Sequence, residues 1–312
     1  MTDTRTRRAA IDIGTVTTRL LVADTDGWRV DEVLRRTVVT HLGEGLHASG
    51  VLAEAAIERV TDAVAGFMRD VAETEAGSIV AVATSAARDA RNGRAFLEAV
   101  AALGVRPRII SGSTEARLSF AGATYAIDDD DVLVADLGGG STELVFGSAH
   151  ETDGGRQVDI DASRSFDVGS RRVLDMFLHG DPPTRAELDA ASAWVVDEMR
   201  PYFEGLREKP RTLITLAGTG TTLSAVKQAL EVYDPSRVHG SRLSGGDVAD
   251  LRDELAAMTL RERREVVGMD PARADVIVAG ALILEAIMAL AGIDTTTVSE
   301  HDILYGLVLE GV

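Results

Sequence analysis

Residues 12–20, DIGTVTTRL, are repeated without a gap as residues 136–144, DLGGGSTEL. Each copy opens on an aspartate and lies between two apolar runs of the β type, such as Ala9–Ile11 before the first copy and Val132–Ala135 before the second. This pattern predicts a strand, a tight polar turn and a second strand, used twice in the chain. The duplication in turn predicts two related domains that face each other across a cleft.

Length and composition agree with two domains. The chain has 312 residues and a hydrophobic fraction of 45%, which is ample for sizeable cores. It has no cysteine, which excludes disulfides, thiolate metal sites and a cysteine nucleophile. Residues 1–8 lack a signal-peptide pattern, and the apolar stretch 276–291 is too short and too polar, at Glu285, for a membrane span. We therefore expect a cytoplasmic protein with no membrane partner.

The charge restricts the partners further. A net charge of −18 gives the chain no general attraction for nucleic acid, so no nucleic-acid partner is expected. A polyanionic substrate would have to be bound locally by backbone amides, arginine side chains and a metal.

Apolar periodicity predicts strands alternating with helices in both halves of the chain. The first half is expected to contain strands at 30–39, 79–83 and 108–110, and helices at 52–73, at 93–103 and from about 113. The acidic run 128–131 is expected to be a loop just after the domain boundary, which gives domains of 1–125 and 126–312. In the second half we expect a strand from Val132, an acidic loop at 150–161, a helix capped by Thr184, a strand at 212–216 and helices at 244–258 and 271–291. This alternation predicts an α/β class with a mixed sheet in each half, and the tail 297–312 could pack back on the first domain.

Three segments combine glycines with hydroxyl side chains. Glycine allows backbone N–H groups to approach an anion, and serine and threonine hydroxyls add donors. Any one of them could be a simple turn, but three in one chain, two of them in register after an aspartate, predict phosphate binding. The candidate phosphate-binding residues are Gly14, Thr15, Thr17, Thr18, Gly138, Gly139, Gly140, Ser141, Thr142, Gly218, Thr219, Gly220 and Thr221.

Several charged residues stand close to these segments. Asp12 and Asp136 end apolar strands, where binding of magnesium explains a carboxylate better than a turn role does. Glu143 alternates with Leu144 on the outgoing strand, which fits an exposed position as well as one facing the cleft. Glu115 and Arg88 each follow a strand, but composition and spacing alone favour the simpler interpretation, a helix-dipole carboxylate for Glu115 and a surface arginine for Arg88. No histidine ligand spacing, Gly-x-Ser-x-Gly elbow or Gly-Lys-Ser/Thr loop occurs, which disfavours zinc, serine-hydrolase and P-loop chemistry.

Six segments of the chain have a recognisable order and spacing: Asp12–Leu20, Ala83–Arg88, Ile110–Leu118, Asp136–Leu144, Ala217–Leu223 and Ser299–Leu304. Through them the chain resembles the exopolyphosphatase/guanosine pentaphosphate phosphatase family over nearly its whole length. The resemblance implies the short two-domain form of that family, with two ribonuclease H-like domains of the actin/Hsp70/sugar-kinase superfamily, and a homodimer. It also implies release of terminal phosphate from polyphosphate, or of the 5′ γ-phosphate from pppGpp.

The resemblance also implies roles for individual residues. Glu115 would orient or activate the attacking water, and Arg88 with the amides of the three segments would bind the terminal phosphoryl group. Asp136 and Glu143 would hold Mg²⁺, or Mn²⁺ in its place, with Asp12 contacting the metal or its water. Val16 replaces the asparagine that is usual in the family, which puts the grip on substrate at this segment in doubt. A kinase or ATPase of the superfamily and a non-catalytic polyphosphate or nucleotide sensor are the remaining alternatives.

Overall fold

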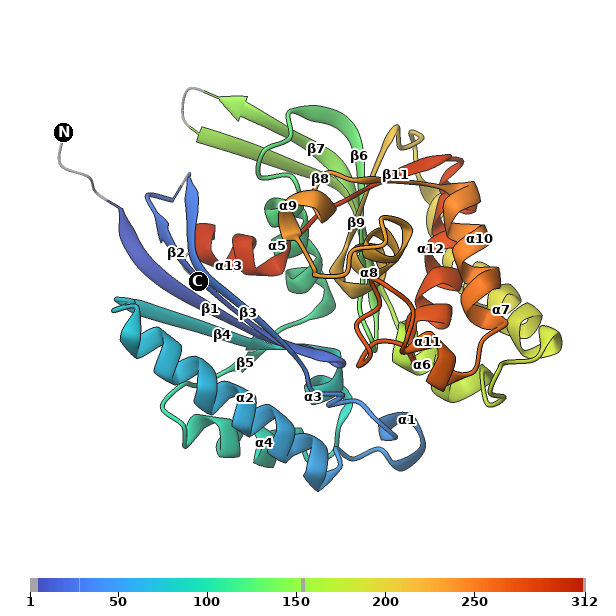
Figure 1. The fold of residues 1–312 in the computed structure, drawn as a ribbon. Coiled ribbons are helices and arrows are strands. Elements are labelled where there is room, and N and C mark those ends of the chain that lie inside the picture. The colour runs from blue at the N-terminus through green and yellow to red at the C-terminus, as the bar shows by residue number, and fades with distance from the viewer. Residues whose placement is uncertain (1–4, 28, 153–154, 311–312) are drawn as a thin grey trace. The chain divides into compact units, whose positions relative to one another are not determined.

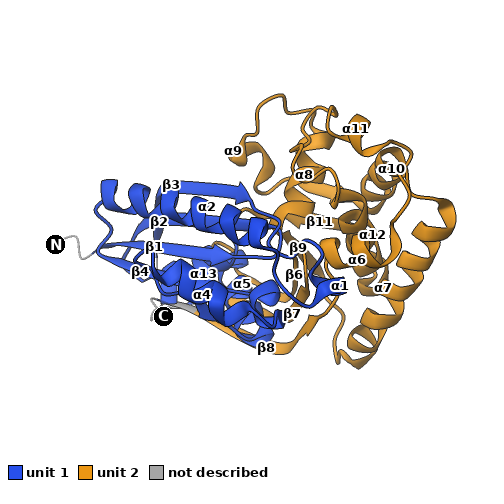
Figure 2. Ribbon diagram, turned by 90° about the horizontal axis from the view of Figure 1, so that it is seen from below, with its two compact units in different colours: residues 1–125, 151–156, 302–312 blue, residues 126–150, 157–301 orange. Residues whose placement is uncertain are grey.

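The protein is described here by a computed structural model that covers residues 5–27, 29–152 and 155–310 (Figure 1). The chain divides into two compact units, which Figure 2 draws in separate colours. Unit 1 consists of the described residues within 1–125, 151–156 and 302–312, and unit 2 of those within 126–150 and 157–301. Each unit has its own sheet, and each sheet mixes parallel and antiparallel pairs, so the predicted α/β class is confirmed.

Unit 1 is built on a five-stranded sheet in the order β3-β2-β1-β4-β5. β1 pairs antiparallel with β2 and parallel with β4. The strands are β1 (Thr6–Ile13), β2 (Thr17–Thr25), β3 (Val30–Val39), β4 (Ser78–Ala83) and β5 (Arg108–Ile109). The helices are α1 (Leu46–Ser49), α2 (Glu54–Glu73), α3 (Ser85–Asp89), α4 (Gly93–Ala101), α5 (Gly112–Ala123) and α13 (Ile303–Glu310).

Helices cover both faces of this sheet, as Figure 1 shows. Alternate residues of a strand point to opposite faces, so the central strand β1 contributes to two cores. Ile11 packs on one face with side chains of α2 and α4, whereas Ala10 packs on the other face with Leu118 of α5 and Leu307 of α13. The C-terminal helix therefore completes the second core of unit 1.

Unit 2 contains a six-stranded sheet in the order β10-β11-β9-β6-β7-β8. β6 pairs antiparallel with β7 and parallel with β9. The strands are β6 (Asp129–Leu137), β7 (Thr142–Thr152), β8 (Gly155–Phe166), β9 (Thr212–Leu216), β10 (Arg242–Ser244) and β11 (Thr295–Val298). The helices are α6 (Ser170–Phe177), α7 (Arg185–Gly205), α8 (Ala217–Lys227), α9 (Pro235–Val238), α10 (Gly245–Ala256), α11 (Leu260–Arg263) and α12 (Ile277–Ala291).

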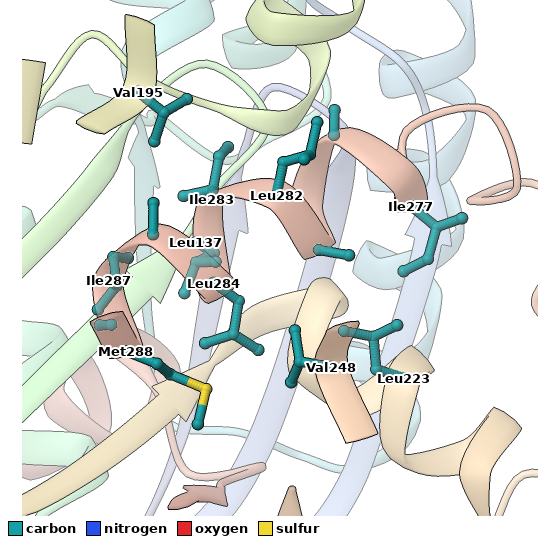
Figure 3. Close-up of a cluster of buried hydrophobic side chains, with 14 of the residues drawn as sticks. Leu137, Val195, Leu223, Val248, Ile277, Leu282, Ile283, Leu284, Ile287 and Met288 are labelled. Atoms are coloured by element: carbon teal, nitrogen blue, oxygen red, sulfur yellow. The ribbon is translucent and has the colours of Figure 1, made fainter. Parts of the chain in front are cut away.

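The core of unit 2 is centred on α12, which is apolar on nearly every side (Figure 3). Ile283 and Ile287 of this helix belong to one cluster with Val195 of α7, Leu223 of α8 and Val248 of α10. A helix that is apolar all round is stable in water only when neighbouring helices cover it. Within the described part of the chain, no helix combines the length and the apolar character that crossing a membrane requires.

Several predicted elements are confirmed at their bounds. β3 spans the predicted residues 30–39, and β9 the predicted residues 212–216. Thr184 caps α7, because its Oγ1 accepts a hydrogen bond from the N–H of Glu187 at 3.3 Å. β9 is a short apolar run of residues typical of strands, and α7 begins at a capping residue, so both carry local signals.

Three predicted elements are wrong in their bounds. The expected acidic loop 150–161 is mostly strand, because Val158, Ile160 and Ala162 alternate with polar residues in β8; residues 153 and 154 lie outside the described part. β6 starts inside the acidic run, at Asp129, and a register shift before Val132 accommodates it. α12 begins at Ile277 rather than at 271, because the preceding residues form tight turns in which the N–H groups of Arg273 and Val276 each donate to the carbonyl oxygen three residues back.

Candidate active site

The first repeat forms the hairpin between β1 and β2, with its turn at residues 14–16. The turn is closed by the N–H of Gly14, which donates to the carbonyl oxygen of Thr17 at 2.8 Å. The hydroxyl of Thr15 is 2.8 Å from that of Ser85 at the start of α3, which ties the turn to the next strand end along the sheet. Val16 is buried, and its carbonyl oxygen accepts hydrogen bonds from two backbone N–H groups after β3. The residue that departs from the family pattern is therefore part of the packing of this turn.

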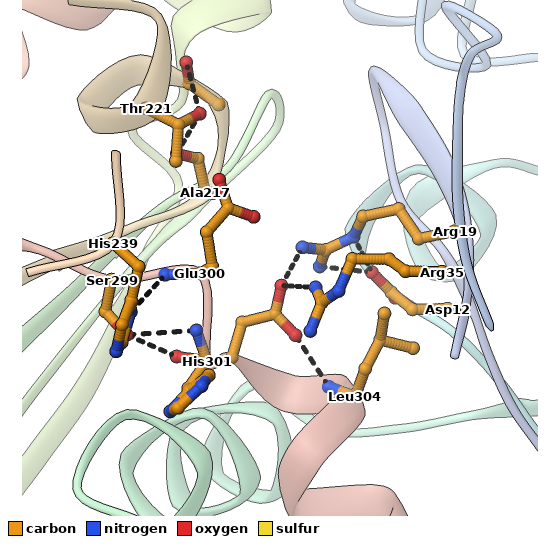
Figure 4. A network of polar contacts seen from close by, with 12 residues as sticks. Asp12, Arg19, Arg35, Ala217, Thr221, His239, Ser299, Glu300, His301 and Leu304 are labelled. Atoms are coloured by element: carbon orange, nitrogen blue, oxygen red, sulfur yellow. Dashed lines mark hydrogen bonds and ion pairs between the residues drawn. The ribbon is translucent and has the colours of Figure 1, made fainter. Parts of the chain in front are cut away.

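Asp12 and Arg19 face each other across this hairpin. They are cross-strand partners in the register, and Arg19 donates to Asp12 Oδ2 from Nε at 3.1 Å and from Nη2 at 2.6 Å (Figure 4). Arg19 also pairs with Asp302, and both carboxylate side chains are only 5% exposed. Burial raises the pKa of Asp12 above its ordinary value, and Arg19 opposes that shift. Asp12 Oδ1 is buried and has no hydrogen-bond partner among the described residues.

Glu115 and Arg88, which no sequence pattern joined, are neighbours in unit 1. Glu115 lies in the first turn of α5, where Ser111 Oγ caps the helix by accepting from the N–H of Thr114 at 3.1 Å. Arg88 Nη1 donates to the carbonyl oxygen of Ile110 at 3.2 Å and lies 3.6 Å from Glu115 Oε2. The Glu115 residue is 8% exposed, so this arrangement places a largely buried carboxylate beside a cation.

The second repeat forms the hairpin between β6 and β7, and we call residues 138–141 at its end the glycine turn. Asp136 and Glu143 are direct cross-strand partners, so both side chains lie on the same face of the sheet. Both residues are buried, and Ser165 of β8 donates to Glu143 Oε1 at 2.7 Å. The corresponding pair in the first repeat joins a carboxylate to an arginine, whereas this pair joins two carboxylates. Two opposed carboxylates favour a bound cation.

The threonine at the end of each turn makes a contact inside the unit. Thr18 is fully buried, and its hydroxyl is 3.0 Å from that of Thr40. The equivalent Thr142 is also fully buried and donates to the carbonyl oxygen of Val168 at 2.6 Å. These hydroxyls hold the turns in place from the inside, and a role of the two residues in binding phosphate stays a prediction.

The third glycine-containing segment is not a turn. β9 ends at Leu216 and α8 begins at Ala217, so residues 218–221 form the first turns of a helix. The first N–H groups of a helix have no partner within it and suit an anion. Phosphate binding at this segment therefore stays a prediction, with the N-terminus of a helix in place of a turn. Leu216 pairs with Asp136 in the parallel register, so α8 and the glycine turn follow neighbouring strands at the same edge of the sheet. Thr221 Oγ1 donates back to the carbonyl oxygen of Ala217 at 3.3 Å (Figure 4).

Sequence reasoning missed several residues of these arrangements. Ser165 comes from a segment far from the turn it supports and stands in no motif. Asp302 lies in the segment Ser299–Leu304, but no role had been assigned to it. Arg273 packs its guanidinium against Gly218 at the start of α8, also without a local signal. Arg19 was detectable, because it occupies in the first repeat the position that Glu143 occupies in the second.

The described residues include no cluster of three or more histidine, aspartate or glutamate side chains placed to hold a metal. A cation in unit 2 would therefore use the pair Asp136 and Glu143 together with water or ligand oxygens. Mg²⁺ commonly binds in this way, since it keeps several waters and takes one or two carboxylates beside substrate phosphates. The donor set fits magnesium.

Known proteins resemble this chain over nearly its full length. It matches the Ppx/GppA phosphatase family at residues 21–311. It is 39% identical to Exopolyphosphatase 2 of Mycobacterium tuberculosis, covering 97% of this chain and 98% of that protein. The crystal structure of an exopolyphosphatase-like protein superimposes with a TM-score of 0.91 at 36% identity, covering 98% of both chains. An exopolyphosphatase from Cytophaga hutchinsonii gives 0.87 at 28% identity, again covering 98% of both chains. On this similarity the chain belongs to the Ppx/GppA phosphatase family.

Proposed function

We propose that this protein is a metal-dependent exopolyphosphatase, which releases orthophosphate from the end of inorganic polyphosphate. The observation that carries the proposal is the cross-strand pair Asp136 and Glu143 at the base of the glycine turn. Two buried carboxylates beside a run of backbone amides suit a divalent cation and the phosphate oxygens it neutralises. The names of the full-length relatives, including Exopolyphosphatase 2 of M. tuberculosis, support polyphosphate as the substrate.

In this proposal Asp136 and Glu143 hold Mg²⁺ or Mn²⁺. A bound divalent cation would neutralise charge on the terminal phosphoryl group and on the departing chain. Asp12 would contact the metal or its water, since Arg19 engages its Oδ2 and its Oδ1 has no hydrogen-bond partner among the described residues. The amides of the two turns and of the start of α8 bind phosphate oxygens.

Glu115 orients the attacking water and Arg88 binds the terminal phosphoryl group. The water oxygen forms a bond to the terminal phosphorus while the bridging P–O bond breaks, and the electron pair stays with the shortened chain. The water proton passes to the Glu115 carboxylate. Because the transition state for phosphoryl transfer is loose, orientation and charge neutralisation supply most of the rate enhancement, and a carboxylate of ordinary basicity suffices.

The test is phosphate release from polyphosphates of defined length and from pppGpp, with Mg²⁺, with Mn²⁺ and with chelator. Three proteins are compared: wild type, Glu115→Gln, and Glu98→Gln as a control. Glu98 lies on α4 with its side chain 68% exposed, so its loss leaves activity unchanged. Glu115→Gln is expected to lower kcat by about 100-fold or more, in the range typical of a lost general base, while polyphosphate binding is retained.

The outcomes separate the alternatives. Metal-dependent release from polyphosphate at a higher kcat/KM than from pppGpp supports the proposal, and the opposite preference identifies a pppGpp phosphohydrolase. Binding without release from either substrate would identify a sensor instead of an enzyme. Light scattering of the purified protein tests the homodimer, which stays a prediction.

A further inference from the structure

The glycine turn of unit 2 is held by the start of α6. The N–H groups of Arg171 and Arg172 donate to the carbonyl oxygen of Gly139 at 2.8 and 3.1 Å, and the N–H of Ser170 donates to that of Gly138 at 3.0 Å. These donors are the first N–H groups of the helix, which have no partner within it. The N–H groups of all three residues therefore bind the turn, and none of the three is available to a ligand.

Two side chains also contact the turn. Ser170 Oγ donates to the carbonyl oxygen of Gly138 at 3.5 Å. Arg172 Nε donates to the carbonyl oxygen of Gly140 at 3.0 Å, and Arg172 Nη2 lies 3.6 Å from Asp167 Oδ1. The Arg172 side chain is only 20% exposed, and a hydrogen bond from a charged donor is stronger than one from a neutral donor. As a result, the carbonyl groups of all three glycines in the turn point toward the 170–172 segment.

These contacts set the direction of the turn's own N–H groups. A trans peptide is planar, and its C=O and N–H point in opposite directions. Fixing the carbonyl groups of Gly138, Gly139 and Gly140 therefore directs the N–H groups of Gly139, Gly140 and Ser141 away from α6. Successive N–H groups that point the same way form a concave site for anions.

The close approach of α6 depends on a glycine and on a buried ion pair. A Cβ on Gly169 would overlap the carbonyl oxygen of Gly139 and lie 2.5 Å from its carbonyl carbon. Arg171 pairs with Asp275, just before α12, with its side chain 9% exposed. Arg171 thus anchors the helix, and Arg172 is the charged side chain that donates to the turn.

We propose that Arg172 is a positioning residue, whose guanidinium holds the Gly140 peptide so that the Ser141 N–H faces the phosphate groups of the substrate. The inference rests on the proposed function for the identity of that substrate as a polyphosphate. It concerns binding rather than the chemical step, because amides oriented in advance contact the phosphate oxygens in both the bound substrate and the transition state. Losing such an interaction raises KM and leaves kcat nearly unchanged.

Two uncharged substitutions isolate the hydrogen bond. In Arg172→Gln the side-chain nitrogen is attached at the same distance along the chain as Arg Nε, so a donor to Gly140 remains. Arg172→Met is similar in length but removes the donor. Arg185→Met is the control for net charge, since Arg185 lies on α7 with its side chain 79% exposed and away from the turn.

The assays are polyphosphate hydrolysis and calorimetric binding of tripolyphosphate in the Glu115→Gln background. Arg172→Met is expected to raise KM and the tripolyphosphate Kd about 10-fold with kcat changed less than threefold, whereas Arg172→Gln stays within threefold of wild type in each. Three results would overturn the proposal. The first is an equal rise in KM and Kd for Arg172→Met and Arg172→Gln, and the second is an equal rise for Arg185→Met. The third is a fall in the kcat of Arg172→Met at constant KM. If Arg172→Met does not fold, Arg172→Gln carries the test, and a 10-fold rise in its Kd overturns the inference. If the wild type hydrolyses no polyphosphate, the proposed function fails, while tripolyphosphate binding still tests the role of Arg172.

Discussion

Replacing Gly122 by alanine should destabilise unit 1, although alanine is the better helix former. Gly122 lies near the end of α5, where that helix meets the start of α13. A Cβ at this position would overlap the carbonyl oxygen of Asp302, lie 2.7 Å from its carbonyl carbon and lie 3.2 Å from the Gly306 nitrogen. Unstrained carbon contacts are about 3.5 Å or longer, so the two backbones would have to separate by more than about 1 Å.

The magnitude follows from two opposed effects. The helical preference of alanine over glycine contributes at most about 1 kcal/mol of stabilisation. Overpacking typically costs about 1–3 kcal/mol, and the upper end applies because the atoms in the way are backbone atoms, which no rotamer change can move. Gly122→Ala should therefore lower the free energy of unfolding by about 2 kcal/mol.

Gly66→Ala is the matched control, since Gly66 is also inside a helix, α2. A Cβ there would meet nothing closer than the end of the Arg69 side chain at 3.8 Å. This variant should be more stable than the wild type by about 0.5–1 kcal/mol. The assay is urea unfolding followed by far-ultraviolet circular dichroism and by fluorescence, with a common slope required before midpoints are compared. A Gly122→Ala protein as stable as Gly66→Ala would refute the close approach of α5 and α13.

Three further predictions concern charged groups. Arg19→Gln should lower the free energy of unfolding by about 3 kcal/mol, because it leaves the buried carboxylates of Asp12 and Asp302 without the cation they share. Urea unfolding should show that most of this loss is recovered when both aspartates are also changed to asparagine. Glu143→Gln should abolish metal-dependent phosphate release. It should leave the melting temperature equal or higher, because it relieves the repulsion between Glu143 and the facing Asp136. A lower melting temperature would contradict this prediction. The ring of His150 donates hydrogen bonds to Asp128 and Asp130, which raises the pKa of His150 above its ordinary value. Its contribution to stability is therefore complete below the pKa that His150 has in the unfolded chain and is lost as pH rises through its pKa in the folded protein. An NMR titration that gives an ordinary pKa for His150 would refute the contact.

The two repeated hairpins show which contacts can be predicted from the local sequence. Asp136 and Glu143 flank a short turn on two apolar strands, so a hairpin register alone places them opposite each other. The same reasoning applies to Asp12 and Arg19. The cap of α7 at Thr184 and the bounds of β3 and β9 were likewise predictable, because each depends on residues only a few positions apart.

Two other predictions were wrong for different reasons. Residues 150–161 are mostly strand although they are acidic, because the charged residues take the exposed positions of an edge hairpin and alternate with Val158, Ile160 and Ala162. The glycine segment after β9 is helical because apolar side chains of α8, such as Leu223, pack into the core around α12. In the second case the packing of segments distant in the chain decided the outcome.

By itself, the sequence determined the two hairpins, the α/β class and the carboxylates and glycines that point to phosphate and magnesium. Only the tertiary structure decided which charges meet: Arg19 with Asp302, Arg88 with Glu115, and Arg172 with the carbonyl oxygen of Gly140. The physical reason is range. Strand period, turn chemistry and capping act between residues close in the chain, whereas a buried ion pair forms wherever packing brings two distant segments together and removes water from between them.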